Sequence, residues 1–166
     1  MNILIAEDFR PMAKAIMEVL EPLGHTVTMV AGFKDLESLR AVDYDGKSEI
    51  LLNAKDFDLA FVDGDLFGSF KGPEVVTRLV LAGVPCFGIS TIEEMNAEMV
   101  ANGAAFAGNK AVVFVLLIGG LFTAEAVVSR DESVAQLLSD CQTNFRTAKY
   151  KDMKRRADEA IARLFA

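Results

Sequence analysis

Short apolar runs alternate with helix-like segments along the first 125 residues, and this alternation constrains the fold more than any other feature. The predicted strands are Asn2–Ala6, Thr26–Val30, Phe57–Val62, Cys86–Ile89 and Ala104–Gly108. Helical spacing of apolar residues or helix end signals predict helices over Pro11–Leu23, Phe33–Leu39, Pro73–Leu81, Thr91–Asn102 and Ala111–Phe122. Strands that alternate with helices build a parallel sheet covered on both faces. The sequence therefore predicts an α/β fold, a doubly wound five-stranded parallel sheet.

Polar side chains directly follow four of these five strands. They are Glu7 and Asp8 after the first, Asp63 after the third, Ser90 after the fourth and Lys110 after the fifth. Carboxyl ends of parallel strands line the ligand crevice of such a sheet, so we expect these side chains to converge. Gathered carboxylates stay ionised together only around a cation, and their hard oxygens with an open face suit Mg²⁺. A lysine and a hydroxyl would complete a phosphoryl pocket, in which one carboxylate can become an aspartyl phosphate.

In this order and position, these residues resemble the receiver domain of two-component response regulators, the flavodoxin-like CheY fold, over about residues 1–125. The resemblance implies that Asp63 is the phosphoacceptor. It also implies that Asp8 binds Mg²⁺ directly, that Glu7 binds it directly or through water, and that the backbone carbonyl of Asp65 is a further ligand. Ser90 takes the place of the family's switch hydroxyl, and Lys110 takes the place of its lysine. The implied protein is no enzyme but a response regulator, which takes its phosphoryl group from a histidine kinase or phosphotransfer protein and signals by protein–protein interaction.

The sequence departs from the family pattern at several points. Ala111 follows the lysine where the family usually has proline, and Leu66-Phe67 stands where it often has Met-Pro. The surplus length near residues 41–52 is expected to extend the second helix or to insert a loop. The position of the switch aromatic holds Ala107, with Phe106 one residue earlier.

These departures motivate an alternative function, a pseudo-receiver that acts as a phosphorylation-independent dimerisation or docking module. A phosphatase or another small Mg²⁺ enzyme is a weaker alternative, because only Asp65 stands near Asp63 as a second acid or base.

The segment Ala111–Phe122 carries no charge, so it lacks the polar face of a surface helix. We expect a cover for it, either a second subunit in a homodimer or the C-terminal segment folded back. Residues 126–166 are predicted to form a helical extension, one long helix or a hairpin. Its apolar stripes are Val134, Leu138, Cys141, Phe145 and Ala148, then Met153, Ala157, Ile161 and Leu164. The extension is too short for a winged-helix output domain, which favours a stand-alone phosphorelay or adaptor protein.

Composition excludes several other classes of function. The 17 basic and 24 acidic residues give a net charge of −7, which argues against nucleic acids or anionic membranes as partners. Two cysteines and one histidine exclude a disulfide framework and a zinc finger. The N-terminus starts as a strand rather than a signal peptide, and the longest apolar run is too short to cross a bilayer. We therefore expect a cytoplasmic location.

Overall fold

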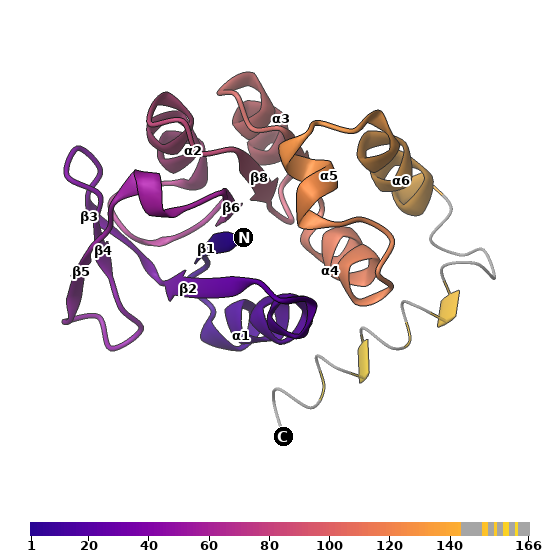
Figure 1. Cartoon of the computed structure of the whole chain (residues 1–166), viewed down its shortest axis with the longest axis horizontal. Helices are drawn as coiled ribbons and strands as arrows, with labels where there is room; N and C mark the ends of the chain where they lie inside the picture. The colour runs from indigo at the N-terminus through magenta and orange to yellow at the C-terminus, as the bar shows by residue number, and fades with distance from the viewer. Residues whose placement is uncertain (144–150, 153–154, 156–157, 160–161, 163–166) are drawn as a thin grey trace.

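A five-stranded parallel sheet forms the centre of the computed structural model, which describes residues 1–143, 151–152, 155, 158–159 and 162 (Figure 1). The strand order is β2-β1-β6-β8-β9. The strands are β1 (Asn2–Ala6), β2 (Thr26–Val30), β6 (Leu59–Asp63), β8 (Cys86–Ile89) and β9 (Phe106–Gly108). The prediction of a five-stranded parallel α/β fold is therefore confirmed.

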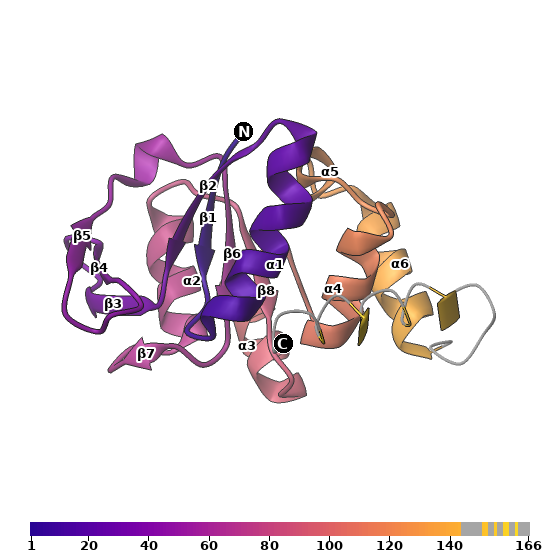
Figure 2. The same ribbon diagram turned by 90° about the horizontal axis from the view of Figure 1, so that it is seen from below.

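Helices cover both faces of this sheet (Figure 2). On one face lie α1 (Arg10–Leu20), which continues into the 3₁₀ turn η1 (Glu21–Leu23), and α4 (Lys110–Ile118). On the other lie α2 (Gly72–Leu81) and α3 (Glu93–Ala101). Alternate residues of each strand point to opposite faces, so Ile3 and Ile5 belong to one apolar cluster and Leu4 belongs to the other.

The predicted helix Phe33–Leu39 is wrong, because residues 36–39 form a turn and residues 33–35 belong to a strand of a second, smaller sheet. Its strands, in the order β5-β4-β3-β7, are β3 (Gly32–Asp35), β4 (Arg40–Val42), β5 (Glu49–Leu51) and β7 (Phe67–Gly68). The surplus residues 41–52 do not extend a helix. They insert most of a hairpin, in which a loop over residues 43–48 joins β4 to β5. Between β5 and β6 the chain forms a 3₁₀ turn, η2 (Ala54–Asp56).

Local hydrogen bonds explain why this segment turns instead of forming a helix. The Asp35 carboxylate accepts hydrogen bonds from the backbone N–H groups of Glu37 (3.2 Å) and Ser38 (3.1 Å). Leu39 then adopts a left-handed conformation with φ of 54°. An aspartate that binds nearby backbone in this way favours a turn over a helix.

The apolar helix α4 is covered by the chain itself. All residues from Val112 to Leu117 are buried. After the short helix α5 (Ala124–Val128), α6 (Glu132–Thr143) packs its buried side chains Val134, Leu138 and Cys141 into the same cluster. One face of α4 meets the sheet and another meets α6, so both need apolar residues.

The prediction of a cover for α4 is thus confirmed, with the folded-back segment as the cover. The second subunit expected as the other possible cover stays a prediction. The apolar positions Phe145, Ala148, Met153, Ala157, Ile161 and Leu164 lie outside the described residues. Within the described part of the chain, none of the helices has the length and apolar character of a membrane span.

We expect the substitution Leu138→Ala to destabilise the protein by about 2–5 kcal/mol, because it leaves a cavity between α6 and α4. Leu138 is 8% exposed and also packs over the backbone of Gly108. Urea unfolding followed by circular dichroism measures this loss. Ser139→Ala, on the exposed side of α6, is the matched control, and equal stability of both variants would contradict the packing described.

Candidate functional site

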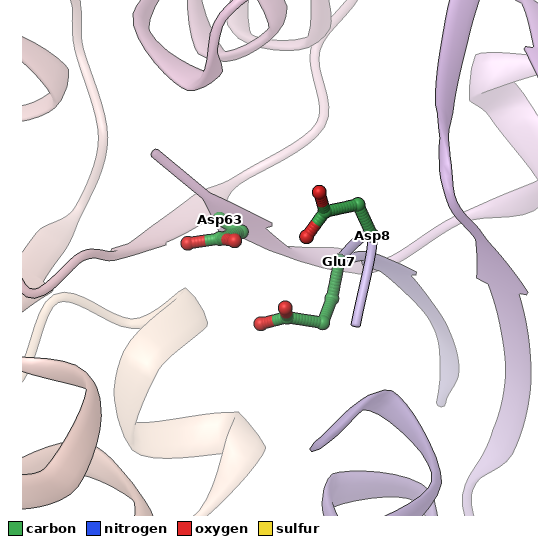
Figure 3. Close-up of side chains that lie close together, drawn as sticks. All are labelled: Glu7, Asp8 and Asp63. Carbon is green, nitrogen blue, oxygen red and sulfur yellow. The ribbon is translucent and has the colours of Figure 1, made fainter. Parts of the chain in front are cut away.

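Three carboxylates meet at the carboxyl edge of the central sheet (Figure 3). Glu7 and Asp8 follow β1, and Asp63 is the last residue of the neighbouring strand β6. One oxygen from each carboxylate lies within 4.8 Å of the others. Glu7 and Asp63 are buried, whereas Asp8 is exposed, so the cluster opens to solvent on one side only. The convergence expected from the strand ends is therefore present.

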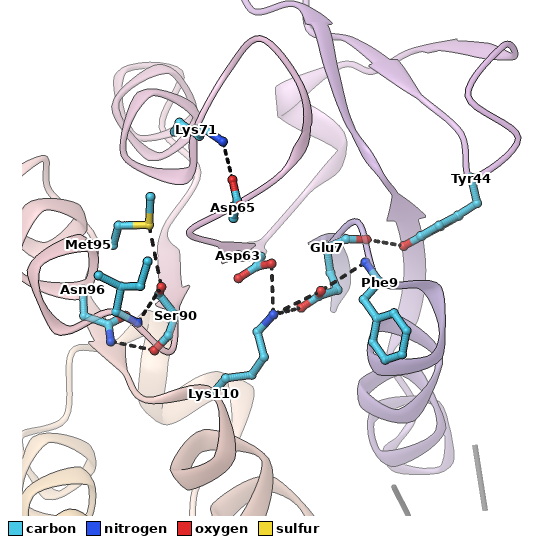
Figure 4. A network of polar contacts seen from close by, with 11 residues as sticks. Glu7, Phe9, Tyr44, Asp63, Asp65, Lys71, Ser90, Met95, Asn96 and Lys110 are labelled. Atoms are coloured by element: carbon cyan, nitrogen blue, oxygen red, sulfur yellow. Dashed lines mark hydrogen bonds and ion pairs between the residues drawn. The ribbon is translucent and has the colours of Figure 1, made fainter. Parts of the chain in front are cut away.

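Lys110 places its ammonium group between the two buried carboxylates (Figure 4). Its Nζ atom lies 3.0 Å from Glu7 Oε2 and 3.0 Å from Asp63 Oδ2, and it donates a hydrogen bond to Glu7 Oε1 at 3.2 Å. Lys110 is the first residue of α4, where the Asn109 side chain accepts a hydrogen bond from the Ala111 N–H. The positive end of the helix dipole therefore lies at the same edge as the ammonium group.

Ser90 lies beside the Asp63–Gly64 backbone. A Cβ atom placed on Gly64 would lie 2.7 Å from Ser90 Oγ, which is too close. The residue after Asp63 must therefore be a glycine for Ser90 to lie this near the backbone. The Ser90 hydroxyl accepts a hydrogen bond from the Ile92 N–H (3.1 Å), and the Ser90 carbonyl accepts one from the Lys110 N–H (3.3 Å). Ser90 thus contacts the segments that follow β6, β8 and β9 and holds them close together.

The Asp65 side chain is exposed and forms an ion pair with Lys71. Its carboxylate does not belong to the cluster of three. The role of its backbone carbonyl as a metal ligand stays a prediction. The loop that carries Asp65 is held by β7, because the Phe67 N–H donates to the Ala31 carbonyl at 3.0 Å. A Cβ atom on Gly32 would lie 2.0 Å from the Phe67 carbonyl oxygen, so β3 needs glycine at this contact.

Burial sets the protonation of the site. Burial and, to a smaller extent, the charge of Asp63 raise the pKa of Glu7 to about 7 against the opposing effect of Lys110. Burial also raises the pKa of Asp63, although Lys110 opposes the shift. Burial lowers the pKa of Lys110, but the two carboxylates outweigh burial and raise it overall. The ammonium group therefore stays charged at neutral pH, where Glu7 titrates.

The residues present fit a magnesium ion. The buried Glu7 Oε2 atom has no hydrogen-bond partner, although the Lys110 ammonium lies 3.0 Å away. A buried carboxylate oxygen without a hydrogen bond is costly, and a cation among the three carboxylates would satisfy it. The three carboxylates and an open, solvent-facing side match the preference of Mg²⁺ for oxygen ligands and retained waters.

Tyr44 is a site residue that the sequence did not reveal. Its hydroxyl donates a hydrogen bond to the Glu7 backbone carbonyl at 2.8 Å (Figure 4). Burial and the nearby charge of Glu7 raise the pKa of the Tyr44 phenol, so it remains a donor. The contact joins residues 37 positions apart, and no local pattern indicates it.

The position expected for a switch aromatic holds no aromatic ring. Ala107 pairs with Gly88 and packs on the α2–α3 side of the sheet. Phe106 faces the other side, where its ring centroid lies 6.2 Å from that of Phe87. The peptide bond between Lys110 and Ala111 is trans, as are all the others described.

The chain is similar in structure to several solved response-regulator receivers. A two-component response regulator from Clostridium difficile matches with a TM-score of 0.56 at 16% identity, covering 79% of this chain and 97% of that one. A CheY-like receiver domain protein from Methanospirillum hungatei JF-1 matches with a TM-score of 0.53 at 17% identity, covering 80% and 97%.

A response regulator from Burkholderia pseudomallei, solved with a phosphorylated aspartic acid, calcium ion and citrate, matches with a TM-score of 0.55 at 16% identity, covering 99% and 91%. No family model matches the sequence, and no curated protein does. At these identities the likeness shows the fold, and this chain has the fold of response-regulator receiver domains.

We expect the metal-free protein to lose stability as the pH rises from about 4.5 to about 7. The pKa of Glu7 is raised in the folded state, so folding binds a proton in this range and its stabilising effect disappears at higher pH. The loss is up to about 3 kcal/mol for a shift of this size. Urea unfolding in the presence of a chelator, repeated across this pH range, measures it.

Glu7→Gln removes the titrating group and should flatten this pH dependence. Glu37→Gln is the control, because Glu37 is exposed and lies outside the cluster. An unchanged slope in the Glu7→Gln variant would contradict the assignment.

Proposed function

We propose that the protein is a Mg²⁺-dependent phosphoacceptor in two-component signal transduction, with Asp63 as the residue that is phosphorylated. The observation that carries the proposal is the Lys110 ammonium group, held 3.0 Å from both Glu7 and Asp63 at the open carboxylate cluster. A carboxylate nucleophile, a fixed cation and a set of oxygen ligands are the parts that phosphoryl transfer to an aspartate needs.

In the proposed reaction an Asp63 oxygen attacks the phosphorus of a phosphohistidine on a histidine kinase or phosphotransfer protein. The new O–P bond forms as the P–N bond breaks, and the histidine ring leaves with the bonding electron pair. Lys110 and the Ser90 hydroxyl are assigned to the phosphoryl oxygens, where a positive charge and a donor stabilise the transition state. A Mg²⁺ ion held by Glu7, Asp8, Asp63 and the Asp65 carbonyl would neutralise the remaining charge.

The product, an acyl phosphate on Asp63, is assigned a signalling role through binding of a partner protein in the cytoplasm. The side chains Val112–Leu117 are buried beneath α6. A homodimer of this chain would therefore use the outer face of α6 rather than α4 itself.

A pseudo-receiver function is the second candidate. Two observations favour it: Ala107 in place of a switch aromatic, and the second sheet in place of a helix between β2 and β6. In that case the same fold would serve as a docking module whose binding does not depend on phosphate.

One experiment separates the two functions. The full chain is incubated with Mg²⁺ and a small phosphodonor such as acetyl phosphate, and then analysed on a phosphate-affinity gel and by intact mass. We expect a single phosphoryl group on the unmodified protein, loss of the label in Asp63→Asn, and no label when a chelator replaces Mg²⁺.

Asp65→Asn is the matched control, because it keeps the backbone carbonyl and changes only an exposed side chain. It should be labelled as well as the unmodified protein. The absence of label on the unmodified protein, or equal label on the Asp63→Asn variant, would favour the pseudo-receiver.

A further inference from the structure

The side chain of Tyr44 connects the segment after β4 to the backbone of the carboxylate cluster. This residue follows β4 in the segment that the sequence presented only as surplus length. Its hydroxyl lies 2.8 Å from the Glu7 carbonyl oxygen and 3.4 Å from the Val30 carbonyl oxygen. The Glu7 N–H donates to the same Val30 carbonyl at 3.1 Å. The peptide groups on both sides of Glu7 are therefore tied to the end of β2 and to Tyr44.

The Glu7 carbonyl belongs to the peptide bond between the two acidic residues. Fixing this oxygen fixes the plane of the Glu7–Asp8 peptide, and hence the direction in which the Asp8 side chain leaves the backbone. The Phe9 N–H donates to Glu7 Oε1 at 3.2 Å, so the turn after β1 is closed on its other side. Because Asp8 is exposed, its side chain is oriented mainly through its backbone. The orientation of the Glu7–Asp8 peptide therefore governs where the Asp8 carboxylate lies relative to those of Glu7 and Asp63.

The tyrosine ring is held in place from several directions. It is half-buried and packs against the apolar cluster formed with α1 and α4. The Arg10 guanidinium lies 5.6 Å from the ring centroid, at the distance of a cation–π contact. The loop behind it is closed by the Asp43 N–H, which donates to the Ser48 carbonyl at 2.9 Å. A ring fixed in this way can hold its hydrogen bond without a large loss of side-chain entropy.

The second sheet also holds the loop on the other side of the cluster. The Ala31 carbonyl accepts the Phe67 N–H at 3.0 Å, and the Ala31 N–H donates to the Val42 carbonyl at 2.9 Å. The backbone that follows Glu7 and the loop that carries Asp65 are thus attached to the same small sheet.

We propose that Tyr44 is a positioning residue for divalent-cation binding, which acts by holding the Glu7–Asp8 peptide in the orientation that the metal site requires. The proposal rests on the metal site of the proposed function, but it concerns metal affinity and not phosphorylation. Partners of metal ligands have this effect in proteins generally, because they orient ligands that would otherwise have to be ordered by the ion.

The test compares Tyr44→Phe with the unmodified chain by isothermal titration calorimetry with MgCl₂ alone. The substitution removes one hydroxyl and keeps the ring, so the packing on α1 and the contact with Arg10 remain. We expect the Kd for Mg²⁺ to rise by about 3- to 10-fold, the value of one hydrogen bond. The rate of labelling by acetyl phosphate should fall at low Mg²⁺ and return to within about twofold of the unmodified protein at saturating Mg²⁺.

Ser48→Ala is the matched control in the same loop. The Ser48 hydroxyl donates a hydrogen bond to the Asp45 carboxylate, so this substitution changes the loop and leaves the Tyr44 hydroxyl in place. This variant tests whether loosening the loop is enough to weaken binding, and we expect its Kd to stay unchanged. Thermal unfolding of both variants in a chelator reports any general loss of stability.

An unchanged Kd in Tyr44→Phe, or an equal rise in Ser48→Ala, would overturn the proposal. Failure of the proposed function has a different signature, in which the unmodified chain binds Mg²⁺ but takes no label on Asp63. The comparison of Kd values still decides the role of Tyr44 in that case. An unmodified chain that binds no Mg²⁺ would overturn both.

Discussion

The placement of one ammonium group between two buried carboxylates is the interaction on which the site depends. Burying a carboxylate without a partner is expensive, and Glu7 and Asp63 lie side by side at the end of the sheet. Lys110 offsets both charges at once. Its position is set by α4, and α4 is fixed because one of its sides packs on the sheet and another packs under α6. The electrostatics of the cluster therefore rest on hydrophobic packing at the far end of the chain.

Much of this arrangement could be predicted from the sequence, because its signals are local. The strands carry short apolar runs, each strand end carries its polar residue, and parallel pairing brings those ends together. The uncharged run after Lys110 also predicted correctly that something must cover it. These inferences need only the periodicity of side chains and the geometry of a parallel sheet.

The failures have a physical cause as well. Phe33, Leu36 and Leu39 have helical spacing, but seven residues are too few for spacing alone to separate a helix from a strand and a turn. The Asp35 side chain decided the outcome by binding the backbone of the turn. Tyr44 could not be found at all, since its contact with Glu7 exists only after the chain around β4 has folded against the ends of β1 and β2.

The fold alone does not determine what the site does, because one fold carries different chemistry in different proteins. The residues themselves do more to define it: the buried Asp63 carboxylate, the Lys110 ammonium group beside it and the Ser90 hydroxyl against its backbone. The structure differs from the sequence expectation in the region around β3, β4 and β5, where a sheet replaces the predicted helix. Tyr44, which follows β4, connects this region to Glu7 of the carboxylate cluster.

The packing of α6 on α4 also bears on how this chain can be divided. Val134, Leu138 and Cys141 belong to the same apolar cluster as Ile3 and Phe61 of the central strands. A fragment that stopped before α6 would present a wholly apolar helix to water and would aggregate or associate with itself. A fragment that keeps this core covered must therefore include α6. When this domain is fused to or transplanted into another protein, the central sheet and α6 must therefore be transferred together.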